Sequence, residues 1–174
     1  MLVALCIDNR GGMLFNHRRL SRDRAQLEDL RQRCGGKPLF IAPFSEKLFS
    51  QWGGEVTVSE HFLEEAGGGE LCFVEDRSLR AVEESIEGLL LYRWNRDYPA
   101  DLFFDLNLAP FTLRERREFP GSSHETITLE IYERRKKDGK EREAKEAETG
   151  AGGAFGPAGA LGGRPLSGRG TEEL

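Results

Sequence analysis

The side chains best suited to bind an anion lie in one basic segment near the start of the chain, residues 16–24, which reads NHRRLSRDR. The segment runs into an amphipathic stretch, and the free N–H groups and positive dipole of a helix start favour phosphate or carboxylate groups. Its candidate ligand-binding residues are Asn16, Arg18, Arg19, Ser21 and Arg24. A second interpretation stays open, in which the arginines form a solvated face and Ser21 only caps the helix.

Two more candidate groups follow apolar runs that read as strands. Asp8 and Asn9 come directly after Leu2–Ile7, and ligands often bind where the strands of an α/β sheet end. An ordinary Asx turn also explains this pair. Tyr92 and Arg93, followed by Trp94, could stack against a planar ring, with packing of the aromatic side chains in the core as the alternative.

Residues for acid–base or covalent chemistry are few. His17 is the one histidine that the sequence places near the predicted cleft, and it is the weak candidate for an acid or base, together with Asp23. An exposed loop histidine is the alternative for His17. No nucleophile-elbow pattern surrounds any of the serines considered, Ser21, Ser45 and Ser59, and no cysteine has an evident histidine partner.

Composition narrows the class of protein. The chain has 174 residues and a formal charge of −5, which makes a general nucleic-acid binder unlikely because phosphate neutralisation needs clustered lysine and arginine. The three cysteines, Cys6, Cys34 and Cys72, are widely spaced in apolar or amphipathic runs, and this spacing favours buried free thiols in a reducing compartment.

The sequence predicts a cytoplasmic protein without a membrane segment. The apolar run after Met1 is too short for a secretion signal and lacks a basic region before it and a small-residue cleavage site after it. No stretch approaches the roughly 18 apolar residues that cross a bilayer.

Residues 1–135 read as a single α/β domain, and residues 136–174 as a disordered tail, first charged and then rich in glycine and alanine. Short apolar runs alternate with amphipathic segments in the first part, as in a sheet covered by helices. A helix is expected from Ser21 to Gly35, a short helix over 45–52, and another helix that Asp76 caps. The expected strands are 2–7, 37–42, 56–58, 71–74, 89–92 and 102–106, followed by a hairpin of 111–119 and 126–132 in which one face of the last strand is buried.

Several short sequence segments resemble those of the dihydrofolate reductase fold family. They are the opening strand and its glycine-containing loop (residues 2–13), Lys37–Ile41, Pro99–Phe103, Glu118–Pro120 and Glu130–Arg134. The resemblance implies a three-layer α/β sandwich with a central mixed, mainly parallel sheet and a C-terminal antiparallel hairpin. Its individual strings are short, and they are spread over residues 1–134.

The positions that carry reductase chemistry in that family do not match. Gln26 stands where the family has the carboxylate that holds the pterin, and the tryptophan before that helix is replaced by residues 17–21. Residues 91–94 replace the Gly-Gly pair that lets backbone approach a pyrophosphate, and Ala42-Pro43 replaces a Gly-Arg pair, with only Ser45 matching the hydroxyl residue that follows. NADPH-dependent hydride transfer is therefore disfavoured, and the cofactor is unknown.

We accordingly expect a diverged reductase-fold protein that binds an anionic or planar small molecule. One alternative is a pteridine- or nicotinamide-dependent reductase whose acid has moved to Asp23 or Glu28. Another is an RNA-processing nuclease, because residues 8–16 resemble the start of short chains that carry the name ribonuclease Z. Those nucleases share a His-x-His-x-Asp-His metal cluster, whereas His17, His61 and His124 are not at ligand spacing, so no metal site is expected.

Overall fold

The alternation of side chains along β1 (Leu2–Ile7) explains its place inside a sheet that is covered on both faces. In the computed structural model, which describes residues 1–136, Val3, Leu5 and Ile7 belong to one buried cluster and Ala4 to another. Successive side chains of a strand point to opposite faces of the sheet, so one strand supplies both layers of core. The predicted tail lies outside the described residues, apart from Lys136.

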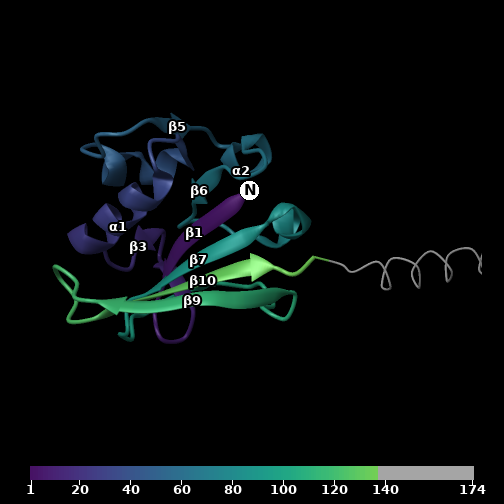
Figure 1. The fold of residues 1–174 in the computed structure, drawn as a ribbon. Helices are drawn as coiled ribbons and strands as arrows, with labels where there is room; N and C mark the ends of the chain where they lie inside the picture. Colours follow the sequence, from purple (N-terminus) through teal and green to yellow (C-terminus); the bar gives the residue numbers. More distant parts are fainter. Residues whose placement is uncertain (137–174) are drawn as a thin grey trace, which may run out of the picture. The chain divides into compact units, whose positions relative to one another are not determined.

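Seven strands form the central sheet (Figure 1). Their order across the sheet is β5 (Val56–Val58), β4 (Leu39–Ile41), β6 (Leu71–Phe73), β1, β7 (Gly88–Arg93), β10 (Ile127–Arg134) and β9 (Phe111–Phe119). The first five run parallel to one another, and β10 and β9 complete the sheet as an antiparallel hairpin. The predicted fold class, a mixed and mainly parallel sheet that ends in a hairpin, is confirmed.

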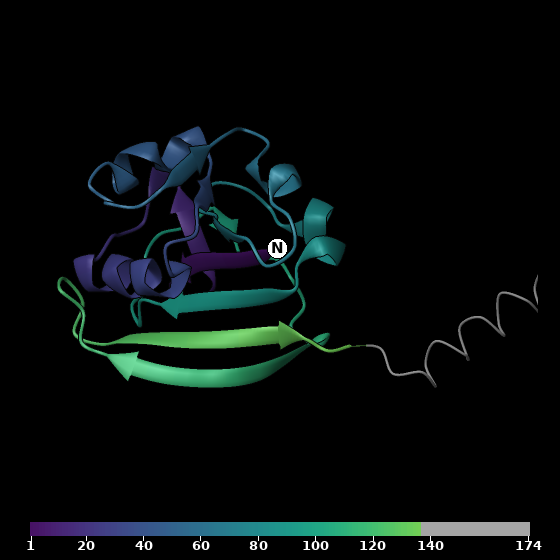
Figure 2. The same ribbon diagram turned by 45° about the horizontal axis from the view of Figure 1, so that its top comes forward.

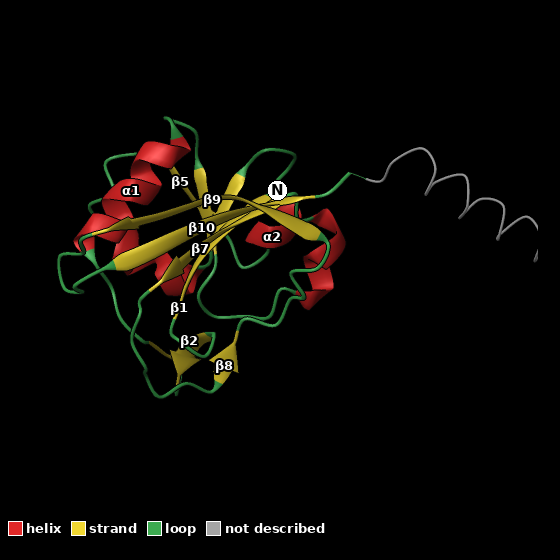
Figure 3. Ribbon diagram, turned by 60° about the horizontal axis from the view of Figure 1, so that its bottom comes forward, coloured by secondary structure: helices red, strands yellow, loops and turns green. Residues whose placement is uncertain are grey.

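Helices cover both faces of this sheet (Figures 2 and 3). One face carries α1 (Arg24–Cys34) and the 3₁₀ helix η1 (Pro43–Phe49), whose Leu30 and Phe49 share a cluster with Tyr92 of β7. The other face carries α2 (Phe62–Glu65) and the 3₁₀ helix η2 (Arg80–Ser85), and its cluster includes Phe62 and the neighbouring Leu79. The sheet is therefore the middle of three layers.

A small second sheet stands beyond the carboxyl end of β1 (Figure 3). It consists of β3 (Arg18–Arg19), β2 (Gly12–Phe15) and β8 (Leu102–Phe103). Asn16 and His17 form the β2–β3 turn with φ angles of 50° and 60°. The sequence analysis had assigned no strand to β2 or β3 and had placed residues 102–106 in the main series of strands.

The helix starts differ from the predicted ones. Asp23, not Ser21, caps α1, because the Asp23 carboxylate accepts the N–H groups of Ala25 and Gln26. The helix ends as predicted at Gly35, which has a left-handed conformation with φ 57°. The second predicted helix begins at Pro43, whose fixed φ suits a first helical position, and Asp76 caps nothing, since its carboxylate pairs with Arg77.

The last strand is buried on both faces near its start, and the prediction of a solvated face was wrong there. Thr128 and Glu130 are buried as well as Ile127 and Leu129. Glu130 tolerates this position because its carboxylate accepts hydrogen bonds from Arg93 Nε at 2.8 Å and from the Tyr132 hydroxyl at 3.0 Å.

The three cysteines are free thiols, as predicted, but Cys6 is only half-buried, whereas the sequence predicted burial of all three. Cys34 and Cys72 are buried, and burial raises the pKa of the Cys72 thiol to about 12. Among residues 1–136, no helix combines the length and the apolar character needed to cross a bilayer.

Close approach of two strands makes Gly88 a sensitive position. A Cβ atom there would lie 2.8 Å from the Tyr132 carbonyl oxygen and 3.1 Å from a Leu2 methyl group. We expect Gly88→Ala to lower the free energy of unfolding by about 1–3 kcal/mol, measured by urea denaturation, because β7 and β10 must move apart. Gly67→Ala, whose Cβ would meet only Glu70 Oε1 at 3.5 Å, is the control, and equal losses in the two variants would contradict this account.

Candidate functional site

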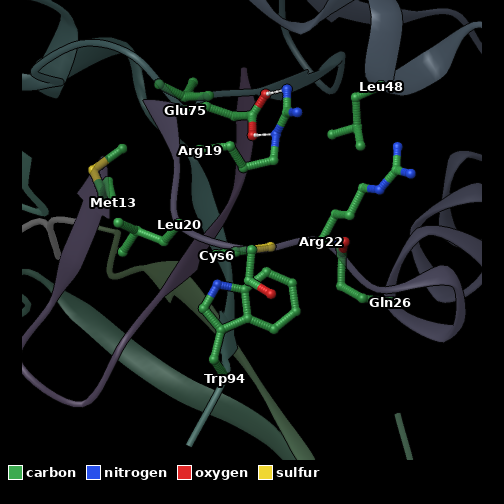
Figure 4. A pocket seen from close by; sticks show the side chains of 11 residues that line it. Cys6, Met13, Arg19, Leu20, Arg22, Gln26, Leu48, Glu75 and Trp94 are labelled. Carbon is green, nitrogen blue, oxygen red and sulfur yellow. Dashed lines mark hydrogen bonds and ion pairs between the residues drawn. The ribbon is translucent and has the colours of Figure 1, made fainter. Parts of the chain in front are cut away.

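The parallel strands β1, β4, β6 and β7 end at one edge of the sheet, and a small cavity lies there (Figure 4). Cys6 from β1, Glu75 after β6 and Trp94 after β7 line it together with Met13 and Arg19 of the second sheet. Its volume of about 10 Å³ is roughly the space that one water molecule needs. The side chains thus leave almost no room inside the edge where α/β folds commonly bind ligands.

A buried ion pair closes one wall of the cavity. Arg19 directs its guanidinium at Glu75 through Nε and through Nη2, the latter 2.7 Å from Oε2, and Ser45 Oγ donates to the same oxygen at 2.6 Å. Glu75 is 7% exposed, so the pair is largely desolvated. The Glu75 carboxylate in turn raises the pKa of Arg19 above its ordinary value. The predicted ligand-binding residue Arg19 therefore already has an internal anion as its partner.

Cys6 faces this pair but is not set up as a nucleophile. Burial, reinforced by the negative charge of Glu75, raises the pKa of its thiol well above the ordinary value. A protonated thiol is a weak nucleophile.

Asp23 is the most heavily hydrogen-bonded carboxylate of the site. Its Oδ1 accepts the backbone N–H groups of Ala25, Gln26 and Ser122, and its Oδ2 accepts those of Ser123 and His124. Burial by itself would raise the pKa of Asp23, but these donors and the His124 side chain outweigh it and hold the pKa well below its usual range. The anion at the start of α1 is thus this side chain.

His124 is the functional-site residue that the sequence analysis missed. Its Nδ1 lies 3.1 Å from Asp23 Oδ2, and its Nε2 lies 3.2 Å from Ser21 Oγ and 3.0 Å from the Tyr98 hydroxyl. The ring stacks on Trp94 with centroids 4.4 Å apart. Nothing local marks this histidine, because its partners are brought to it by the β9–β10 hairpin.

The burial of the Gln26 side chain is energetically unfavourable. This residue is 2% exposed and lines the cavity, and in the part of the chain that the structure describes its Nε2 is a buried donor without a hydrogen-bond partner. An unpaired buried donor costs about 1–3 kcal/mol, so this amide calls for a functional explanation.

A larger groove lies beside the cavity, between the start of α1 and the end of η1. Its volume is about 670 Å³, within the range of small-molecule sites. Four basic side chains line it, Arg22, Arg24, Arg31 and Lys47. Arg31 pairs with Glu28, whereas the other three form no ion pair with a carboxylate among residues 1–136. Arg22 and Leu48 line both the groove and the cavity.

The Asp8 carboxylate is hydrogen-bonded to backbone groups, mainly those of its own loop. It is fully buried and accepts the N–H groups of Arg10, Gly12 and Tyr98 at 2.9, 2.6 and 3.0 Å. Burial opposes the lowering, but these donors still lower the pKa of Asp8. Asn9 is exposed and donates to Asp97 at 3.0 Å.

The other predicted residues do not meet in one place. Asn16, His17 and Arg18 are exposed in or beside the β2–β3 turn, while Arg24 lines the groove. Tyr92 is fully buried and donates its hydroxyl proton to Asp29 at 2.6 Å, and Arg93 pairs with Glu130. Burial together with Asp29 raises the pKa of Tyr92.

Bulky side chains occupy the end of β7. Tyr92 is 0% and Trp94 3% exposed, so their side chains fill the region where a glycine pair would admit a pyrophosphate. Ser45, which matches the family's hydroxyl residue, is buried against Glu75. Nor do three or more metal-ligating side chains gather anywhere in residues 1–136.

Comparison with known proteins identifies the fold. No protein-family model matches the chain, and no curated protein is significantly similar to it in sequence. The structure is similar to that of a dihydrofolate reductase from Enterococcus faecalis complexed with NADP(H) and RAB-propyl, with a TM-score of 0.57 over 78% of this chain and 97% of the other. At 13% identity this similarity shows the fold alone, and it confirms the predicted reductase-like architecture.

The Arg19–Glu75 pair should be strongly coupled. We expect Arg19→Met and Glu75→Gln each to lower the free energy of unfolding by about 2–4 kcal/mol, because each leaves a desolvated polar partner unmatched, and the double variant to lose less than the sum. Urea denaturation of all four proteins measures this coupling. The exposed pair Arg114 and Glu133 provides a matched cycle that should couple by less than about 1 kcal/mol; similar coupling in both cycles would contradict the assigned role.

Asp23 should make the fold sensitive to acid. Because its pKa is lower in the folded than in the unfolded chain, its contribution to stability is complete above about pH 4 and is lost as the pH falls below that value toward the folded-state pKa. We expect the urea midpoint of the native chain to fall more steeply between about pH 5 and pH 2 than that of Asp23→Asn.

The exposed Glu28 on the same helix supplies the control, and Glu28→Gln should follow the native pH profile. An Asp23→Asn profile parallel to the native one would show that Asp23 is not the group responsible.

Proposed function

We propose that this dihydrofolate reductase-fold protein binds a small molecule with a carboxylate or phosphate group in the groove between α1 and η1, and that it does not reduce folates with NADPH. The observation that carries the proposal is the set of three unpaired cations, Arg22, Arg24 and Lys47, around one groove of about 670 Å³. Unpaired cations that converge on a concave surface favour an anionic ligand.

The groove also offers an apolar wall for the rest of the ligand. Leu27, Leu48 and Trp52 line it as well, and Trp52 is only 8% exposed and held by edge-to-face contact with Phe49. A planar or aliphatic body would bury its surface there, while its anionic group stays at the cations.

A reductase with a relocated acid receives less support. Asp23 has its oxygens saturated by backbone donors and stays ionised, so it has no proton to give near neutral pH. Glu28 is exposed and paired with Arg31. Side chains fill the end of β7, and this supports a function that does not use NADPH.

A thermal-shift screen tests this binding function. We expect phosphorylated and polycarboxylate metabolites in the panel to raise the melting temperature by several degrees when well above their Kd. Arg22→Ala and Arg24→Ala should each weaken binding about tenfold or more, since each removes a charge-assisted contact. Arg114→Ala, on the exposed strand β9, should leave binding unchanged.

NADPH with dihydrofolate forms the second arm of the experiment, and no oxidation of NADPH is expected. A panel without any stabilising anion, or stabilisation that survives the double substitution of Arg22 and Arg24, would refute the binding proposal. Turnover of NADPH would refute the exclusion of reductase activity.

A further inference from the structure

We propose that Ser21, His124 and Asp23 form a nucleophile, base and orienting carboxylate that transfer small acyl groups from esters. The three side chains lie in the order this chemistry requires: Asp23 Oδ2 is 3.1 Å from His124 Nδ1, and His124 Nε2 is 3.2 Å from Ser21 Oγ. Such an array is recognised by its geometry and not by the order of residues in the chain.

The hydrogen-bond partners determine which ring nitrogen can act as a base. Nδ1 faces a carboxylate that only accepts, so Nδ1 carries the hydrogen and Nε2 of the neutral ring presents its lone pair to Ser21. Asp23 stays ionised because of its backbone donors, and it can therefore stabilise the imidazolium that forms. Stacking on Trp94 keeps the ring in this plane.

Tyr98 also approaches Nε2, at 3.0 Å. Nε2 has one lone pair, so the Tyr98 hydroxyl competes with Ser21 for it in the resting protein. Removal of this hydroxyl leaves Ser21 as the hydroxyl partner of the base, and Tyr98 is therefore dispensable in the proposed reaction.

Gln26 supplies the donor for the oxyanion. Its buried Nε2 has no partner among the described residues. Its side chain, labelled in Figure 4, lines the cavity that Ser21 also lines. A fixed amide donor in a water-poor site is the group that stabilises the negative oxygen of a tetrahedral intermediate. This role accounts for a donor whose burial is otherwise an uncompensated cost.

Access to Ser21 comes from the groove. Arg22 and Leu48 line both the groove and the cavity, so the two spaces are neighbours there, and the proposed path of the ester runs between these two side chains. The cavity of about 10 Å³ has room for about one water molecule, so the acyl group must lie toward the groove, and a small one such as formyl or acetyl displaces the fewest side chains. The proposed binding function of the groove implies that the alcohol released from the ester carries an anionic group. The acyl transfer itself does not rest on that binding function.

The proposed reaction is the hydrolysis of an ester and consumes one water molecule. Ser21 Oγ forms a bond to the carbonyl carbon while its proton passes to His124 Nε2, and His124 returns this proton to the departing alcohol as the C–O bond breaks. Water then attacks the acyl-serine, gives a proton to His124, and releases the carboxylic acid as Ser21 recovers its proton. One ester and one water give one acid and one alcohol.

The test is covalent labelling of the full chain by a fluorophosphonate, read by intact mass and peptide mapping, together with hydrolysis of p-nitrophenyl acetate. We expect a single label at Ser21, no label in Ser21→Ala, and a labelling rate at least about 100-fold lower in His124→Asn. Tyr98→Phe should keep the reaction. A thermal unfolding curve of each variant serves to check that the variant is folded.

Ser59 provides the matched control. Its hydroxyl donates to Glu65 at 3.0 Å, and it lines neither the cavity nor the groove, so Ser59→Ala should keep the label. Labelling no faster than in the denatured chain, equal labelling of other serines, or folded Ser21→Ala with native hydrolysis would overturn this inference. Anion binding without Ser21 reactivity refutes the acyl transfer alone, whereas Ser21 reactivity without anion binding refutes the groove alone.

Discussion

The buried carboxylate of Asp23 is the interaction on which the candidate site depends. It holds the first turn of α1 and the β9–β10 loop at the same point, although these segments are about a hundred residues apart in the chain. The loop can approach so closely because residue 121 is glycine: a Cβ there would lie 2.6 Å from Asp23 Oδ2 and 2.6 Å from the His124 carbonyl oxygen. Without this contact, His124 would have no fixed position beside Ser21.

A second constraint is charge burial at the ends of the parallel strands. Bulky groups, Trp94 and the Arg19–Glu75 pair, occupy the edge of the sheet where this architecture would otherwise admit a ligand. Each buried charge has its partner, and Ser45 adds a further hydrogen bond to Glu75. The unmatched donor is Gln26, and the unpaired cations lie outside this edge, along the groove.

The architecture is similar to that of dihydrofolate reductase, and this similarity shows the fold alone. At the ends of the strands Tyr92, Trp94 and Ser45 are buried, and Ser45 donates to Glu75. A scaffold keeps its fold as long as its core volume and strand pattern persist, whereas an activity depends on a few side chains at defined positions. The groove and the Ser21–His124–Asp23 array are properties of these particular residues.

Local patterns in the sequence determined the main elements. Alternating and continuous apolar runs predicted β1, β4, β5, β6, β7 and the closing hairpin, and Gly35 predicted the end of α1. Strands β2 and β3 of the small sheet were missed because β3 is two residues long and the two strands meet through a turn of two non-glycine residues with positive φ. Periodicity requires more residues than these strands possess.

Only the tertiary structure decided which polar groups meet. Asp23 bonds His124 across 101 residues, and Arg19 pairs with Glu75 across 56; neither partner is marked by any local pattern. Sequence alone identified Asp23 and Ser21 as polar residues at a helix start, but it did not show that Asp23 is the cap or that both side chains contact a histidine. That choice follows from the strand order, which carries the β9–β10 loop to the start of α1 and thereby sets every long-range contact of the site.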